Sequence, residues 1–86
     1  MGKAEKLLRR FLSKPKDFTL EELERLLRGF GYQEVKTGKT SGSRAAFINY
    51  RTKHIIRLHK PHPRPGLKRY QFDYIEEELR NKGVIK

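Results

Sequence analysis

The chain has 86 residues, which is enough for one small domain but not for two separate cores. It contains no cysteine, so neither a disulfide nor a thiolate zinc site stabilises it. It also lacks an apolar run of about 18 residues and the apolar segment of a signal peptide, so we expect a cytoplasmic protein with no membrane partner. The formal net charge is +11.

The positive charge is concentrated in the middle of the chain. No Asp or Glu lies between Val35 and Phe72, and all ten acidic residues lie outside this segment. Such a segment is the electrostatic pattern of a nucleic-acid binder, because each neutralised phosphate releases condensed counterions. The alternative is a solvated basic surface without a partner. Ten basic residues occupy the segment: Lys36, Lys39, Arg44, Arg51, Lys53, Arg57, Lys60, Arg64, Lys68 and Arg69.

Two helices are predicted in the N-terminal third. Apolar residues at helical spacing predict the first over residues 3–13, and "SKPKD" ends it. Thr19 and Glu22 form a capping box at the start of the second, and Phe18 and Leu23 are spaced as a hydrophobic staple. Glycine 29 or 31 ends this second helix.

Three strands and a last helix follow. The segments "YQEVKT" (32–37), "SRAAFIN" (43–49) and "KHIIRL" (53–58) predict strands, with Ala45 and Phe47 on one side of the second. Apolar residues at helical spacing after residue 71 predict the last helix, which Gly83 closes. We expect residues 84 and 85 to fold back onto this helix.

This order predicts an α+β fold, α-α-β-β-β-α. One three-stranded antiparallel sheet carries helices on one face. The first helix, in residues 1–17, is predicted to be an extension to an α-β-β-β-α core in residues 18–86.

Two kinds of chemistry are disfavoured by the motifs. "TGKTSGS" lacks the first glycine of a phosphate-binding P-loop, since position 33 is Gln, although Lys39 in a flexible turn can still touch phosphate. His59 and His62 have two prolines, Pro61 and Pro63, beside them and no cysteine or acid nearby to complete a metal shell. We therefore expect neither a metal nor a cofactor.

Metal-independent cleavage of RNA remains open, because the 2′-OH of RNA attacks its own neighbouring phosphate. Such cleavage needs proton transfer, which histidine provides near neutral pH, and cations on the phosphate oxygens. His59 and His62 lie in the basic, proline-rich stretch "RLHKPHPRPG" and are the candidates for proton transfer; simple phosphate contact is the alternative. We interpret His54, early in the third strand, as structural.

Residues 18–86 resemble the HicA toxins of bacterial toxin–antitoxin systems. The resemblance rests on "FTLEELERLLRGFGYQEVK", on Gly42-Ser43 before the second strand, on "LHKPHP" and on "LKRYQFDYIEEELRNKGVI". It implies a fold like the double-stranded-RNA-binding domain, an mRNA endoribonuclease activity and a HicB-like antitoxin as partner. In HicA toxins a histidine, taken as catalytic, commonly follows Gly-Ser, and this chain has Arg44 there.

The resulting hypothesis is a toxin that is a monomer alone, joins its antitoxin in a hetero-oligomer and cuts mRNA. Arg44 and Lys60 would hold the scissile phosphate, His59 would transfer a proton, and His62 would be its partner. One alternative is a non-catalytic RNA- or DNA-binding module, and a weaker one is an adaptor for an acidic protein. The residues predicted to bind RNA are Lys36, Lys39, Ser43, Arg44, Lys60, Arg64, Lys68 and Arg69.

Overall fold

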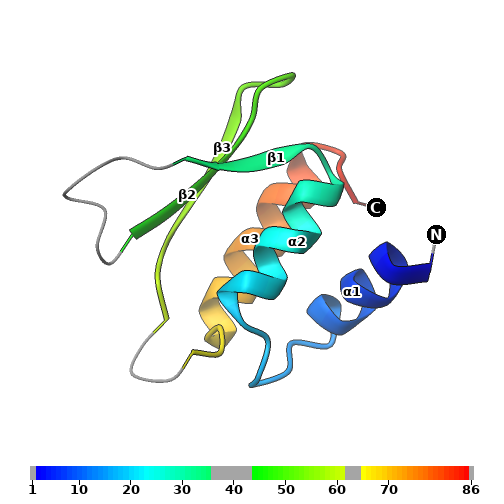
Figure 1. The fold of residues 1–86 in the computed structure, drawn as a ribbon, viewed down its shortest axis with the longest axis vertical. Coiled ribbons are helices and arrows are strands. Elements are labelled where there is room, and N and C mark those ends of the chain that lie inside the picture. Colours follow the sequence, from blue (N-terminus) through cyan, green and yellow to red (C-terminus); the bar gives the residue numbers. More distant parts are fainter. Residues whose placement is uncertain (1, 36–43, 62–64, 86) are drawn as a thin grey trace.

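The computed structural model describes residues 2–35, 44–61 and 65–85. The order of elements is the predicted α-α-β-β-β-α, and the three strands form one antiparallel sheet in the order β1-β2-β3 (Figure 1). The elements are α1 (Gly2–Leu12), α2 (Leu20–Gly29), β1 (Tyr32–Val35), β2 (Arg44–Asn49), β3 (His54–His59) and α3 (Arg69–Asn81).

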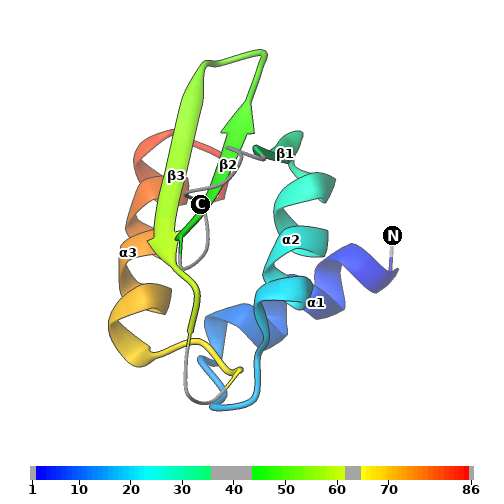
Figure 2. The ribbon, with the colours of Figure 1, turned by 60° about the vertical axis from the view of Figure 1, so that its left-hand side comes forward.

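The sheet has one covered face and one open face. Helices α2 and α3 lie on the same side of the sheet, and α1 lies beyond them (Figures 1 and 2). Along β2, Ala45 and Phe47 are buried under the helices, as their alternation predicted, and along β3 the buried positions are His54, Ile56 and Leu58. The residues between them point to the open face, because successive strand side chains alternate.

Helix α2 begins at the predicted capping box. The Thr19 hydroxyl accepts a 3.2 Å hydrogen bond from the Glu22 backbone N–H, and the Glu22 carboxylate accepts a 3.0 Å bond from the Thr19 backbone N–H. Phe18 and Leu23 are both fully buried, as expected of a hydrophobic staple. The helix ends at Gly29, and Gly31 (φ +96°) takes the left-handed conformation that turns the chain into β1.

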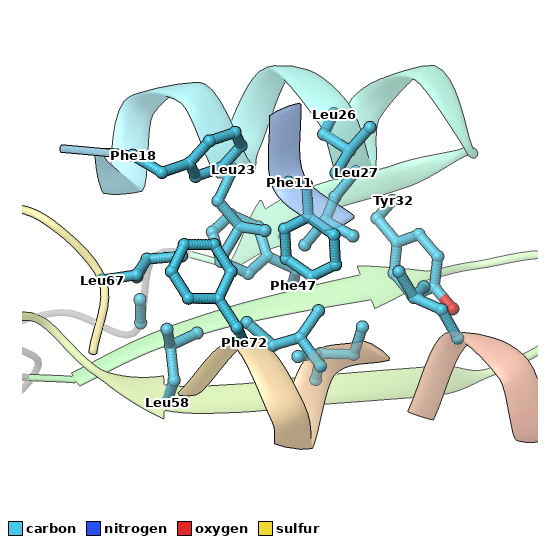
Figure 3. Packing of buried hydrophobic residues seen from close by; sticks show 14 of the residues in the cluster. Phe11, Phe18, Leu23, Leu26, Leu27, Tyr32, Phe47, Leu58, Leu67 and Phe72 are labelled. Carbon is cyan, nitrogen blue, oxygen red and sulfur yellow. The ribbon is translucent and has the colours of Figure 1, made fainter. Parts of the chain in front are cut away.

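Helix α1 shares the core of the other elements. Phe11 is fully buried, and its ring centroid lies 5.8 Å from that of Phe18 and 5.3 Å from that of Phe72 (Figure 3). Arg10 adds a 2.9 Å ion pair with Glu22 of α2. Truncation of a buried Phe to Ala typically costs about 3–5 kcal/mol, so this helix contributes strongly to stability.

The C-terminal residues return to α3 as predicted. Gly83 has φ +72°, and the Val84 backbone N–H donates a 2.9 Å hydrogen bond to the Leu79 carbonyl. Ile85 is buried in the core cluster. In residues 2–35, 44–61 and 65–85, no helix is both long and apolar enough to cross a membrane.

Candidate functional site

Strand pairing brings two of the predicted site residues together. In the antiparallel register of β2 and β3, Arg44 is the direct partner of His59. Both side chains are exposed, and both alternate with buried neighbours, so they lie side by side on the open face. The sequence placed His59 in the loop after the third strand. That was wrong: His59 is the last residue of β3, because the strand begins and ends one residue later than predicted.

The one-residue shift has a local cause. Lys53 has φ +65° and closes the turn between β2 and β3, where its backbone N–H donates a 2.7 Å hydrogen bond to the Asn49 carbonyl. A residue in the left-handed region cannot continue a strand, so β3 starts at His54. The same turn sets the register that pairs His59 with Arg44.

The rest of the open face is apolar and basic. Next to the Arg44–His59 pair, Ala46 is paired with Arg57, and the following pair joins Ile48 and Ile55. The β1 residues on this face are Gln33 and Val35, partners of Ile48 and Ala46. None of the strand residues described on this face is acidic, so the cations at its Arg44 end have no strand carboxylate beside them.

Gln71 fixes the end of β3 against the start of α3. Its side-chain amide is only 2% exposed. The amide N–H donates a 2.8 Å hydrogen bond to the backbone carbonyl of His59, and its oxygen accepts a 3.0 Å bond from the backbone N–H of Lys68. The backbone of Lys68 is thereby linked to the end of β3 through Gln71, and the side chains of Lys68 and Arg69 are both exposed, with Arg69 3.8 Å from Asp73. Gln71 was not predicted from the sequence, where its only signal is a polar residue among apolar ones on the inner face of a helix.

The far end of the proline-rich loop is tied to the α1–α2 connection. The Leu67 backbone N–H donates a 2.7 Å hydrogen bond to the Phe18 carbonyl, and Gly66 forms an isolated bridge with Thr19. A Cβ added at Gly66 would lie 1.9 Å from the Lys16 carbonyl oxygen, so this position requires glycine. The loop is therefore anchored on both sides of residues 62–64.

His54 lies inside the protein, as expected for a structural histidine. Its Nδ1 lies 2.5 Å from the Tyr32 hydroxyl oxygen, and its Nε2 lies 2.8 Å from a Glu78 carboxylate oxygen. The neutral ring satisfies both contacts when Tyr32 donates to Nδ1 and Nε2–H donates to Glu78. Burial, and then the charge of Glu78, raise the pKa of Tyr32, which keeps the hydroxyl protonated. Of the two histidines described, only His59 is open to a ligand.

The described basic residues between Val35 and Phe72 lie towards opposite ends of the sheet. Arg51 and Lys53 lie in the turn between β2 and β3, at the opposite end of the strands from Arg44 and His59. A six-residue strand spans about 20 Å, so these two residues do not belong to the Arg44 end of the sheet. Lys60 follows His59 directly and is half-buried. Five predicted site residues lie outside the described residues: Lys36, Lys39, Ser43, His62 and Arg64.

Three of the four acidic residues of α3 contact other side chains of the protein. Lys14, in the α1–α2 connection, contacts Asp73 at 2.5 Å and Glu76 at 3.3 Å. The bond to Lys14 lowers the pKa of Asp73, and bonds to Arg80 first and then to Lys14 lower the pKa of Glu76. With Glu78 accepting a hydrogen bond from His54, three of the four acids of this helix contact other side chains.

A groove of about 320 Å³ lies between β3 and α3, next to this site. Its lining is almost wholly apolar although it includes Arg57 and His59. Tyr70 and Tyr74 of α3, one helical turn apart, form its other side together with Gln71. The two tyrosines were not predicted as site residues from the sequence, where their i, i+4 spacing is the available signal.

Comparisons with protein-family models, with curated proteins and with solved structures found no match to this chain. The assignment of function therefore depends on the residues and their geometry.

Proposed function

We propose that this protein is a HicA-like toxin, a metal-independent mRNA endoribonuclease of the cytoplasm that a HicB-like antitoxin neutralises. The pairing of Arg44 with His59 on the open face of the sheet carries the proposal. It joins a fixed cation, suited to bidentate contact with a phosphate, and an imidazole, suited to proton transfer near neutral pH. The element order after α1 also agrees with the double-stranded-RNA-binding-domain-like fold that the resemblance implies.

The residues have distinct roles in the proposed reaction. His59 takes the proton of the ribose 2′-OH, whose oxygen attacks the adjacent phosphorus, and the bond from phosphorus to the 5′ oxygen breaks. The products are a 2′,3′-cyclic phosphate and a 5′-hydroxyl, which receives a proton from a second group; His62 is the candidate. Arg44 stabilises the charge that builds up on the phosphate oxygens, and Lys60, Lys68 and Arg69 hold the flanking backbone.

The open face also supports an antitoxin as partner. Its part nearer the β2–β3 turn is apolar, with Ile55 36% exposed beside Ile48, and its other part carries Arg57, paired with Ala46, and Arg44. A protein with an acidic patch beside an apolar one would complement this surface and cover the reactive pair at the same time.

A non-catalytic RNA-binding module is the second candidate. In its favour, His54 is engaged inside the protein by Tyr32 and Glu78, so the described residues place a single accessible imidazole at the site. A phosphate contact needs one such group, whereas cleavage with both an acid and a base needs two.

Measuring cleavage and binding on the same His59→Gln protein separates the candidates. His59 meets Gln71 through its backbone carbonyl, so the substitution leaves that contact in place. For a ribonuclease we expect cleavage to fall roughly 100- to 10,000-fold while RNA affinity changes little. Loss of affinity and cleavage together would make His59 a contact residue, and a parent protein that binds RNA without cutting it would favour the second candidate.

A further inference from the structure

The groove between β3 and α3 has no role in the reaction described above. It joins the phosphate-binding end of the sheet through Arg57 and His59, which belong both to the open face and to the groove lining. We propose that this groove binds one unpaired nucleobase, stacked on Tyr70 and Tyr74, and that the RNA is consequently single-stranded at the cleavage site. The proposal rests on the proposed function in that it places the neighbouring phosphate at Arg44 and His59.

Tyr70 and Tyr74 are more exposed than tyrosines whose role is to stabilise the core. Tyr70 is 63% exposed and Tyr74 is 38% exposed, so most of the Tyr70 ring contributes nothing to the core. They lie at i and i+4 on α3, which places their rings on one side of the helix, above the groove. Aromatic rings of this kind are the usual platforms for unstacked bases in single-stranded nucleic acids.

The volume and the lining of the groove suit a base. About 320 Å³ is at the lower end of the range of small-molecule sites, roughly 300–1,000 Å³. The almost wholly apolar lining suits the face of a base and not a phosphate. The charged edge formed by Arg57, next to His59, suits the phosphate joined to that base. An apolar side chain of a protein partner would fill the apolar part of the groove but would make no use of its charged edge.

The charges around the groove favour an anionic ligand over a neutral or basic side chain. None of the described residues that line the groove is acidic. Asp73 contacts Lys14 and lies 3.8 Å from Arg69, Glu76 contacts Lys14, and Glu78 contacts His54. Glu77 is exposed on α3 but is not part of the groove lining. A nucleotide therefore meets aromatic rings and the Arg57 guanidinium with no carboxylate in the lining.

Stacking in the groove also explains why the site would act on unpaired RNA. A base in a duplex is covered on both faces by its neighbours and cannot enter between β3 and α3. A base in a loop or a single strand pays no unpairing cost before it stacks on tyrosine. We therefore expect selectivity for single strands from the tyrosines, and general phosphate affinity from the basic residues.

Equilibrium binding tests the proposal with two labelled oligonucleotides of equal length and charge. One is single-stranded RNA, and the other has abasic positions in place of the central bases. The parent protein should bind the first more tightly by on the order of 5- to 100-fold, the range of one stacked base. Tyr74→Ala and Tyr70→Ala should lower that preference without changing affinity for the abasic strand, and Tyr74→Phe should retain it.

Tyr50→Ala is the matched control. Tyr50 is 56% exposed but lies in the turn at the opposite end of the sheet, so its removal should leave the preference intact. The chain has no tryptophan, so Tyr70→Trp supplies a single fluorescent reporter. Its emission should be quenched by single-stranded RNA and unaffected by the abasic strand.

The outcomes distinguish failure of the proposed nucleobase site from failure of the proposed ribonuclease activity. If both alanine variants keep the full preference for bases, the groove does not bind a nucleobase and is left for an apolar protein side chain, whatever the cleavage rate. If the tyrosine effects appear in a protein that never cuts RNA, the base site stands and the ribonuclease fails. Equal affinity of the parent for duplex, single-stranded and abasic strands would overturn the base site alone.

Discussion

The side-chain amide of Gln71 donates a 2.8 Å hydrogen bond to the backbone carbonyl of His59. This bond crosses from the first turn of α3 to the last residue of β3, and it holds the candidate proton-transfer residue by its main chain. Gln71 is thus a positioning residue. The position of the imidazole depends on a buried amide that acts through the backbone of β3.

Gln71→Glu should damage both stability and cleavage. The carboxylate still accepts from the Lys68 N–H but cannot donate to the His59 carbonyl when ionised, and it buries a charge at a position 2% exposed. We expect a loss of about 1–3 kcal/mol in the free energy of unfolding. We also expect slower cleavage at an RNA affinity close to that of the parent, measured on the folded fraction.

Gln33→Glu is the control for this change, because Gln33 is an exposed residue of β1. It makes the same change of charge without burying it, so its unfolding free energy should stay close to that of the parent. Equal effects of the two substitutions would show that charge, and not the bond to His59, is responsible.

Arg44→Ala should lower cleavage by roughly 100-fold, as expected for the loss of one transition-state donor. Arg44 is exposed at the start of β2, so the melting temperature should change little. Arg44→His should keep or raise activity, because it restores the residue that the resemblance implies at this position. Cleavage of a labelled RNA measures all three proteins, and parental rates in both variants would remove Arg44 from the site.

Gly66→Ala should destabilise the protein although it adds only a methyl group. That methyl would lie 1.9 Å from the Lys16 carbonyl oxygen, so the backbone of one of the two loops must move. Overpacking of this kind typically costs about 1–3 kcal/mol. Gly29→Ala is the matched control, because nothing lies within 4 Å of its added Cβ, and it should be neutral or stabilising. Chemical denaturation of both variants gives the comparison.

The stability of the fold should decrease in acid through Glu22. The hydrogen bond from Arg10, and next the bond from the Thr19 backbone, hold the pKa of Glu22 below its ordinary value. The unfolded chain therefore binds this proton more readily than the folded one. The stabilisation is complete above the ordinary pKa, near pH 4.3, and is lost as pH falls below it through the folded pKa.

Glu22→Gln isolates this effect, because glutamine can still accept from the Thr19 N–H while carrying no charge. At pH 7 the variant should be less stable than the parent, and the difference should shrink as the pH is lowered from 5 to 2. Urea midpoints across that range measure it. A difference that stays constant with pH would contradict an electrostatic role for the Arg10–Glu22 pair.

The sequence by itself determined the elements of this fold and their order. The capping box of Thr19 and Glu22, the staple of Phe18 and Leu23, and the alternation of Ala45 and Phe47 all act within a few residues. Patterns of this range fix helix starts, strand faces and turns because backbone geometry repeats every 3.6 or 2 residues. The basic segment between Val35 and Phe72 was equally plain from the sequence alone.

Only the tertiary structure decided how the site is assembled. Arg44 and His59 are fifteen positions apart, and their pairing depends on a turn in which Lys53 takes φ +65°. Gln71 holds the His59 carbonyl from twelve positions away, and the groove with Tyr70 and Tyr74 exists only because α3 packs beside β3. These relationships follow from strand register and packing, which depend on contacts distant in the sequence and so leave no local pattern.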